Sequence, residues 1–276
     1  MVARSSVSQL LIIALIIILI GISLAWICRF KRHAVLAPQF YTDTRGHHWV
    51  PCPADAVVIV TFGQSLAANS HEHVYDKAPS KDVYLYFTGR CFYLADPLMG
   101  ATGQEGSIWI PAASKLAGQT GRPVVVIAGG VDGTAIQQWT SPDSPLVAPL
   151  RARVDEAKRS GLPPNVYIWM QGEKDAILGT PPAIYQAHLK RLFRLFPDAP
   201  WLITSNSICT DTPLRSGALD QARRSFAQTT PGVEVSVDLD GLGIDYRMPD
   251  RCHFNQRGQE LAGVAIADAV ARLVRK

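Results

Sequence analysis

The chain has 276 residues, of which 47% are hydrophobic, and this is enough for one membrane segment and a single globular domain with a sizeable core. The length argues against a second full domain. The 27 basic and 23 acidic residues give a formal net charge of +4, and much of the excess lies around an N-terminal apolar run, so nucleic-acid binding has little support.

The first predicted element is a membrane span within an N-terminal anchor of residues 1–33. Residues 10–27 form an almost unbroken run of Leu, Ile and Ala, interrupted by Gly21 and Ser23. A helix of this length can cross a bilayer, so we expect a span over about residues 9–28. A cleaved signal peptide is the alternative, but its apolar core is usually only about 7–15 residues long.

Two features give opposite indications of the side of the membrane on which the folded domain lies. Arg29, Lys31 and Arg32 follow the apolar run, and basic flanks prefer the cytoplasm. An even number of cysteines follows the anchor and could form two disulfides in an oxidising compartment. These are Cys52, Cys91, Cys209 and Cys252. Four unrelated thiols are the alternative.

The remaining chain predicts a linker at residues 34–53, which lack a clear periodicity, and one folded domain at 54–276. Short β-branched runs alternate there with longer helical patterns. The expected strands are residues 56–62, 123–128, 166–170, 201–205 and 233–238. The expected helices are residues 111–119, 145–160, 181–195, 214–228 and 256–274. This alternation predicts a five-stranded parallel sheet covered on both faces, a three-layer α/β/α fold.

An insertion precedes the second of these strands, at residues 83–94. Two aromatic-rich runs flank the sequence Thr88-Gly89-Arg90, which is typical of a turn. We therefore expect a β-hairpin in this segment.

Polar residues directly follow three of the predicted strands. Ligands of an open parallel sheet bind beyond the carboxyl ends of its strands, so a site is expected there. The three segments are Gly63-Gln64-Ser65, Gly129-Gly130-Val131-Asp132-Gly133-Thr134 and Gln171-Gly172-Glu173. Asp250 and His253 precede the final predicted helix.

Ser65, His253 and Asp250 are the expected catalytic residues. A serine hydroxyl is a poor nucleophile at neutral pH unless an adjacent imidazole accepts its proton. Asp250, three residues before His253, can hold the ring tautomer that leaves the other nitrogen free to accept this proton. A serine after a strand is often only a helix cap, and Asp250 with His253 could be a surface cap. The order and strand placement of all three residues favour nucleophilic catalysis.

These segments, in this order, resemble the SGNH hydrolase superfamily and, more narrowly, its sialate O-acetylesterase and carbohydrate esterase family 6 branch. The resemblance covers nearly everything from Ala54 onward. It rests on Gly-Gln-Ser, on Gly-Gly with a later Trp139, on Gln-Gly-Glu-x-Asp at residues 171–175 and on Asp-x-x-His. It implies a flavodoxin-like fold and a serine esterase that removes O-acetyl groups from carbohydrate through an acyl-enzyme, without a metal or organic cofactor.

The resemblance also implies an oxyanion hole, because the tetrahedral intermediate carries a negative oxygen that needs preorganised donors. The expected donors are the backbone N–H groups of Ser65 and Gly133 and the side-chain amide of Gln171. Gly130 is the competing candidate for the donor role of Gly133, because the Gly-Gly pair that contains it could also form the tight turn. The branch often has Asn directly after the nucleophile, whereas here Leu66-Ala67-Ala68 precede Asn69.

Other polar residues of these segments are possible substrate-binding residues. They are Gln64, Asn69, Gly130, Thr134 and Glu173. Glu173 and Asp175 could form an acid–base pair, but the neighbouring Lys174 and the short loop favour a structural role. His71 and His73 lie near Ser65, but they lack a matching carboxylate or cysteine arrangement, so no metal is expected.

Cys209 is expected to pair with Cys252, because both lie at the same edge of the sheet, and Cys52 is then left with Cys91. The oxidising compartment that this pairing requires predicts a single-pass membrane protein with a periplasmic or extracellular catalytic domain. Two alternatives stay open: an O-acyltransferase acting on a glycan, and a catalytically silent, membrane-tethered carbohydrate-binding protein.

Overall fold

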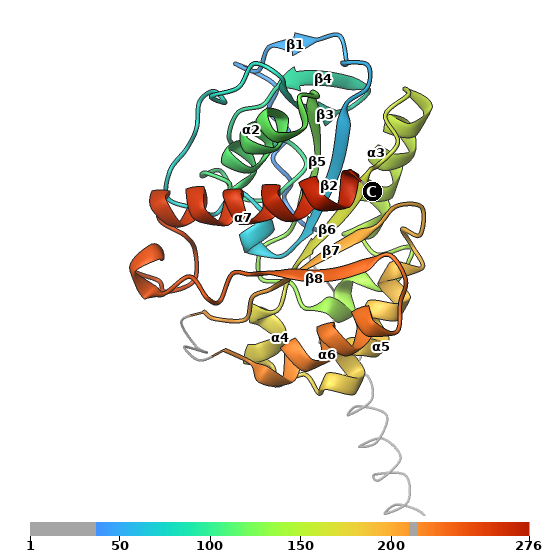
Figure 1. Cartoon of the computed structure of the whole chain (residues 1–276), viewed down its shortest axis with the longest axis vertical. Helices are drawn as coiled ribbons and strands as arrows, with labels where there is room; N and C mark the ends of the chain where they lie inside the picture. The colour runs from blue at the N-terminus through green and yellow to red at the C-terminus, as the bar shows by residue number, and fades with distance from the viewer. Residues whose placement is uncertain (1–36, 210–214, 276) are drawn as a thin grey trace, which may run out of the picture. The chain divides into compact units, whose positions relative to one another are not determined.

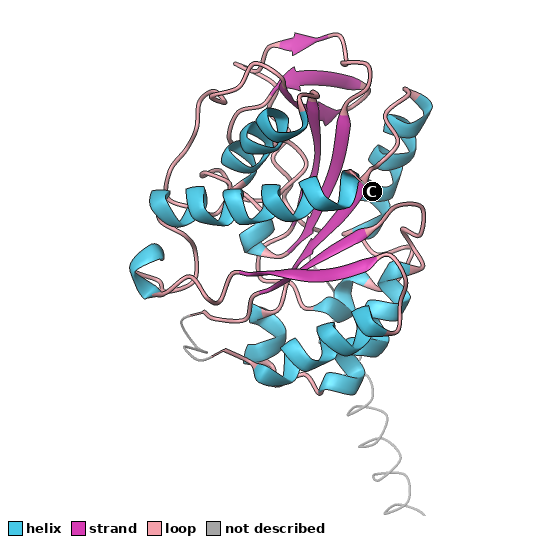
Figure 2. Ribbon diagram, in the orientation of Figure 1, coloured by secondary structure: helices cyan, strands magenta, loops and turns pink. Residues whose placement is uncertain are grey.

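A computed structural model describes residues 37–209 and 215–275 (Figure 1). The compact unit of the chain runs from Pro38 to Lys276. Its centre is one eight-stranded sheet in the order β1-β4-β3-β5-β2-β6-β7-β8. Helices pack against the strands on both sides (Figure 2). The predicted α/β class is confirmed, whereas the predicted number of five strands is wrong.

The elements have the following bounds. The strands are β1 Trp49–Val50, β2 Val57–Gly63, β3 Val83–Phe87, β4 Arg90–Tyr93, β5 Val124–Gly130, β6 Val166–Met170, β7 Trp201–Ser205 and β8 Val233–Asp238. The helices are α2 Trp109–Thr120, α3 Val147–Arg159, α4 Glu173–Ile177, α5 Pro182–Phe193, α6 Gly217–Gln228 and α7 Gln256–Val274. Three short 3₁₀ turns are η1 Ser65–Ala67, η2 Ile136–Trp139 and η3 Ile244–Tyr246.

The extra strands come from the insertion and from the segment before the predicted domain. The expected hairpin is present as β3 and β4, and it extends the sheet because β3 pairs in parallel with β5. The strand β4 runs antiparallel to β3 and to β1. The five predicted strands correspond to β2, β5, β6, β7 and β8, which are all parallel. A hairpin has its own turn and pairs within itself, so its sequence pattern does not reveal that it joins the main sheet.

Part of the predicted linker is folded onto this unit. The N–H of Tyr41 donates to the carbonyl of Ala101 at 2.8 Å, and the carbonyl of Tyr41 accepts from Gly100 at 2.8 Å. Further along, β1 pairs with β4, and Cys52 forms a disulfide with Cys91. A two-residue strand is too short to produce a periodic pattern, which is why these residues resembled a linker.

The alternation of side chains along β2 supplies both faces of the sheet. Ile59 lies in the core cluster that contains Trp109 of α2. Phe62 points to the other face, where its ring contacts Trp169 and Trp201. Burial on both faces explains why this strand is a continuous apolar run.

The predicted membrane span, residues 10–27, lies outside the described residues. None of the helices within residues 37–209 and 215–275 combines the length and the apolar content needed to cross a bilayer.

Candidate active site

Ser65 begins the 3₁₀ turn η1, two residues after the end of β2. The turn is possible because Gly63 has a φ of +135°, and a Cβ at this position would collide with the carbonyl of Met170 in β6. Ser65 is 7% exposed. Its backbone N–H opens the turn and therefore has no partner within it, as an oxyanion donor requires.

The turn is held in place from two sides. A Cβ on Gly130 would collide with the backbone of Ala67 and Ala68, so the end of β5 packs directly on the turn. The indole Nε1 of the fully buried Trp109 donates to the carbonyl of Ala67 at 2.9 Å. Gly130 therefore allows close backbone packing, and its roles in substrate binding or as an oxyanion donor stay predictions.

Asp250 and His253 form a pair on the turn before α7. The ring Nδ1 of His253 lies 2.6 Å from Oδ2 of Asp250. The other oxygen, Oδ1, accepts from the N–H groups of Cys252 at 2.9 Å and of His253 at 3.1 Å. Partial burial acts to raise the pKa of Asp250, but these hydrogen bonds and the imidazole outweigh it and hold the pKa below its usual value. An ionised Asp250 keeps the proton of a neutral His253 on Nδ1.

This arrangement leaves Nε2 of His253 as a free base. The atom is buried and has no hydrogen-bond partner among the residues that the structure describes. Ser65 also lacks a side-chain hydrogen bond within this part of the chain, so the Ser65 to His253 bond is not closed here. Catalytic hydrogen bonds are often long before the substrate binds.

His71 connects the segments that carry the nucleophile and the base. Its Nε2 lies 3.2 Å from the carbonyl of Leu66, and its Nδ1 accepts from the N–H of Phe254 at 3.0 Å. Burial lowers the pKa of His71 to about 3, against the hydrogen bond to Leu66, which raises it. The ring is therefore neutral with its proton on Nε2. Both ring nitrogens are occupied, so neither is free to bind a metal.

Gln171 follows β6, and its amide is fully occupied by the protein. Its Nε2 donates to Oδ2 of Asp175 at 2.6 Å, to the carbonyl of Thr134 at 3.1 Å and to Oε1 of Gln64 at 3.2 Å. Its Oε1 accepts from the hydroxyl of Tyr185 at 3.0 Å. An amide nitrogen carries two hydrogens, and three acceptors already compete for them. The structure therefore contradicts the predicted oxyanion role of Gln171 and gives it a structural role.

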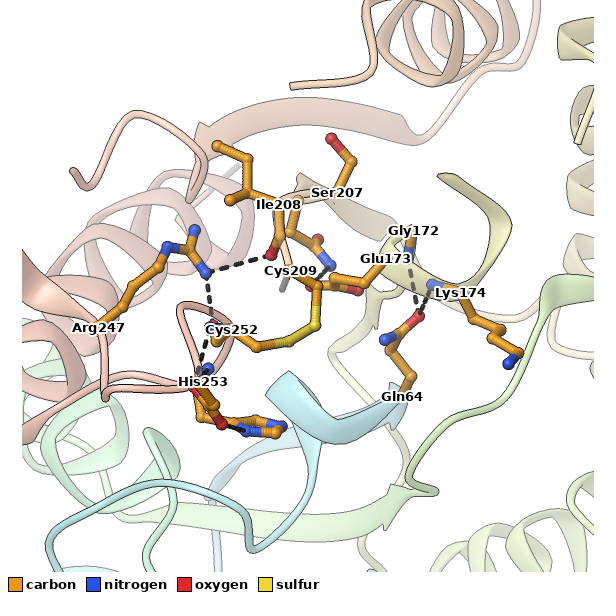
Figure 3. The surroundings of a disulfide bond; sticks show 12 residues. Gln64, Gly172, Glu173, Lys174, Ser207, Ile208, Cys209, Arg247, Cys252 and His253 are labelled. Carbon is orange, nitrogen blue, oxygen red and sulfur yellow. Dashed lines mark hydrogen bonds and ion pairs between the residues drawn. A yellow bond between two sulfur atoms is a disulfide. The ribbon is translucent and has the colours of Figure 1, made fainter. Parts of the chain in front are cut away.

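Gln64, next to the nucleophile, is held by its carbonyl oxygen. Oε1 accepts from the backbone N–H of Gly172 at 3.3 Å and of Lys174 at 3.1 Å, as Figure 3 shows. A Cβ on Gly172 would collide with the guanidinium of Arg223 and the carbonyl of Asn206, so only glycine fits between them. The third polar segment is thus fastened to the residue before Ser65.

Two other predicted substrate-binding side chains are used inside the protein. Asn69 donates through Nδ2 to the carbonyl of Leu98 at 3.0 Å and accepts at Oδ1 from its N–H at 2.7 Å. The hydroxyl of Thr134 donates to the carbonyl of Val131 at 2.8 Å and accepts from the indole of Trp139 at 2.9 Å. These contacts leave neither side chain for a substrate, which corrects the prediction.

Glu173 and Asp175 make contacts that support the structural interpretation. Oε1 of the buried Glu173 accepts from Asn206 at 2.9 Å, and burial raises the pKa of Glu173 against this hydrogen bond, which lowers it. Asp175 accepts from the N–H of Ile136 at 2.7 Å and from the hydroxyl of Thr180 at 2.6 Å. Asp175 therefore holds the second and third polar segments together.

Gly133, the other predicted backbone donor, lies in an exposed turn. It is exposed, has a φ of +66°, and no heavy atom of the described residues lies within 4 Å of the place where a Cβ would be. The segment is fixed on either side, because Asp132 donates its N–H to the hydroxyl of Thr102 at 2.9 Å and Thr134 bonds to Val131. The oxyanion role of Gly133 stays a prediction.

A disulfide between Cys209 and Cys252 borders the site, and the predicted pairing of all four cysteines is confirmed. Figure 3 shows the bond beside His253. The guanidinium of Arg247 donates to the carbonyl of Cys252. The turn that carries the catalytic base is thus fixed by a covalent bond and by a buried cation.

Sequence reasoning missed the bridge formed by His71 and the support given by Arg223. The fully buried guanidinium of Arg223 donates to the carbonyls of Gln171 and Asn206, both at 2.8 Å, and pairs with Asp220 at 2.9 Å. An arginine on the apolar stripe of α6 is the signal that could have revealed it, because a buried charge needs partners. No comparable signal marked His71.

A family model described as "Carbohydrate esterase, sialic acid-specific acetylesterase" matches residues 106–272, more than half of the chain. The chain belongs to this family. It is a hydrolase of ester bonds, as its polar segments predicted. A search of curated proteins found no match.

Solved structures show the same fold at low sequence identity. A protein from Arabidopsis thaliana is 18% identical with a TM-score of 0.62, over 77% of this carbohydrate esterase and 96% of that chain. A carbohydrate acetylesterase from Xanthomonas citri is 15% identical with a TM-score of 0.54, and the match covers 79% of this chain and 57% of that chain. A family 3 carbohydrate esterase from Talaromyces cellulolyticus is 13% identical with a TM-score of 0.51, over 79% of this chain and 99% of that chain.

Proposed function

We propose that this esterase removes O-acetyl groups from carbohydrate through an acetyl-enzyme on Ser65. The observation that carries the proposal is the Asp250 to His253 pair, which fixes the proton on Nδ1 and leaves Nε2 without a partner among the described residues. The bridge through His71 brings this base to the nucleophile turn. The match to the carbohydrate esterase family supports the substrate class.

The reaction has two halves. Ser65 Oγ attacks the acetyl carbonyl carbon while His253 Nε2 takes its proton, and the negative oxygen is held by the N–H groups of Ser65 and Gly133. The intermediate then expels the sugar oxygen, which takes the proton from His253. Water then attacks the acetyl-Ser65 ester while His253 Nε2 takes a proton from it. The bond from the acetyl carbon to Ser65 Oγ breaks, Ser65 Oγ receives this proton from His253, and acetate leaves.

Ser65→Ala tests the assignment. We expect it to abolish nearly all release of acetate from a panel of acetylated xylan fragments and sialic acids, without changing the unfolding temperature. A fluorophosphonate probe should label the wild-type protein at Ser65 and leave the variant unlabelled. Substantial turnover by the variant would refute Ser65 as the nucleophile.

We also propose that residues 10–27 hold the enzyme in a membrane with the catalytic domain outside the cytoplasm. The length of the apolar run and the two disulfides support this topology. A C-terminal reporter fusion and mass spectrometry of the non-reduced protein from its native membrane test it. Free thiols together with a cytoplasmic reporter signal would contradict it.

A further inference from the structure

We propose that a cavity at the amino ends of the parallel strands binds one acidic sugar ring, a saccharide unit that carries a carboxylate. The cavity has a volume of about 430 Å³ and is lined by the segment before β1, the segment before β3 and the end of β4. This volume lies within the range of small-molecule sites. The inference uses the membership of the chain in a carbohydrate esterase family and does not depend on the proposed acetyl-enzyme.

The cavity lies where the parallel strands begin, whereas Ser65 lies where they end. Val83, which lines the cavity, is the first residue of β3 and pairs with Val124, the first residue of β5. Ser65 comes two residues after the end of β2, which runs parallel to β5. Both β2 and β5 have seven residues, so at about 3.3 Å per residue roughly 20 Å separate the two places. The cavity is therefore a second site, apart from the catalytic one.

Tyr93 supplies an aromatic face to this cavity. It is 48% exposed, although it lies within the sheet. The ring of Tyr84 packs on it with 5.8 Å between centroids and 25° between planes, and no other ring or cation of the described residues contacts it. One side of the Tyr93 ring is therefore open to the cavity that it lines. The C–H groups of a sugar ring can pack against the negative face of such a ring.

The other walls combine apolar side chains with polar groups that the protein leaves unused. Val83 and Leu94 line the cavity and are buried. The exposed side chains of Asp76, Lys77 and Lys81 line it too, and they have no hydrogen bond or ion pair with any of the described residues. A few polar groups on an apolar wall are typical of a small-molecule site. Sugar hydroxyls both donate and accept, so they match carboxylate and ammonium groups alike.

The charges that line the cavity favour a carboxylate on the sugar. Lys77 and Lys81 carry two positive charges against the one negative charge of Asp76. Burial lowers the pKa of His47, another lining residue, against Asp43, which raises it, so this ring is neutral at pH 7. These groups leave a single positive charge in excess, which a carboxylate balances. A phosphate monoester carries about −1.5 to −2 and would exceed it.

Glucuronic acid, glucose and glucose 6-phosphate are matched probes, because they share one ring and differ in charge. In titration calorimetry of the full chain, we expect a single saturable site for glucuronic acid and about tenfold weaker binding of glucose. Lys77→Gln combined with Lys81→Gln should remove this preference. No binding of glucuronic acid, equal affinity of the wild type for glucose, or tighter binding of glucose 6-phosphate would each overturn the inference.

Tyr93→Ala separates this site from the catalytic one. The variant loses the aromatic face, so we expect it to bind glucuronic acid about tenfold more weakly and to hydrolyse 4-nitrophenyl acetate at the wild-type rate. Trp49→Ala is the matched control. Trp49 is 63% exposed in the neighbouring strand, but it pairs with Phe92 and therefore lies on the opposite face of the sheet from Tyr93. Equal losses of binding in the two variants would contradict the inference.

A protection experiment on the wild-type protein covers the case in which Tyr93→Ala does not fold. Glucuronic acid should slow the reaction of Lys77 and Lys81 with an N-hydroxysuccinimide ester, as mass spectrometry measures at each lysine. The exposed Lys115 of α2 should react at the same rate with and without the sugar. Unchanged rates at all three lysines would overturn the inference. Because none of the sugar probes is acetylated, a failure of Ser65 as the nucleophile would leave these results unchanged.

Discussion

His71 illustrates how one side chain can organise an active site without touching the substrate. It joins the carbonyl of Leu66 to the N–H of Phe254, so each catalytic segment is positioned against the other. Its ring also stacks on Phe254, with an angle of 17° between the ring planes. A histidine that holds two backbone groups at once must stay neutral.

His71→Phe should keep the stacked shape and remove both hydrogen bonds. Two buried backbone groups would lose their partners, so we expect a loss of about 2–5 kcal/mol in the free energy of unfolding. We also expect a fall in kcat of at least tenfold, because Ser65 and His253 would lose their alignment. His73→Phe is the matched control, since that ring is only half-buried against Tyr75. Equal effects of the two variants would contradict the positioning role.

The same variant has a pH signature in chemical denaturation. Histidine in the unfolded chain binds a proton near pH 6.5, whereas burial lowers the pKa of folded His71 to about 3. Its stabilising effect is therefore complete above about pH 6.5 and is lost as the pH falls toward 3. The difference in unfolding free energy between wild type and His71→Phe should shrink from pH 7 to pH 4. A constant difference would show that folding does not lower the pKa of His71.

Among the larger elements, the two disulfides offer a comparison within one molecule. The pairs are separated by 39 and 43 residues, so in the chain-entropy model each stabilises the fold by a similar amount, about 4 kcal/mol. One bond, Cys209–Cys252, borders the catalytic base. The other joins β4 to the segment after β1, at the edge of the sheet and away from β2.

Replacing both members of each pair with alanine should therefore separate stability from activity. We expect the two double variants to lose similar unfolding free energy, and only Cys209→Ala with Cys252→Ala to lose several-fold in kcat. The reason is that its bond constrains the turn that holds Asp250 against His253. Steady-state kinetics and denaturant unfolding of both variants provide the test. A matching loss of kcat in the Cys52 and Cys91 variant would contradict the local role.

The sequence predicted elements well where burial imposes a pattern. The strands β2 and β5 are continuous apolar runs, and the polar residues at their ends marked the site. It could not predict β1, which has two residues and depends on β4 for its hydrogen bonds. The direction of the amides of Gln64 and Gln171 was equally hidden, because it is decided by donors and acceptors that lie far apart in the chain.

For the whole molecule, the start of the folded unit has a practical consequence. A chain that begins at Ala54 lacks β1 and Cys52, and it leaves Cys91 as a buried free thiol. We expect it to unfold at a clearly lower temperature than a chain that begins at Pro38, because it loses the disulfide, worth about 4 kcal/mol, and the pairing of β1 with β4. Thermal unfolding of the two chains tests this. Equal midpoints would show that residues 38–53 add nothing to the fold.

The pairing of the cysteines also bears on how the enzyme is made. Four cysteines allow three sets of two bonds, and here the first is joined to the second and the third to the fourth of the folded unit. Chains emerge during synthesis from the N-terminus, so Cys52 and Cys91 meet before Cys209 exists. An oxidant that joins these cysteines as they appear makes the native bonds directly. We therefore expect maturation of this unit to need an oxidase and to proceed without an isomerase that exchanges wrong partners.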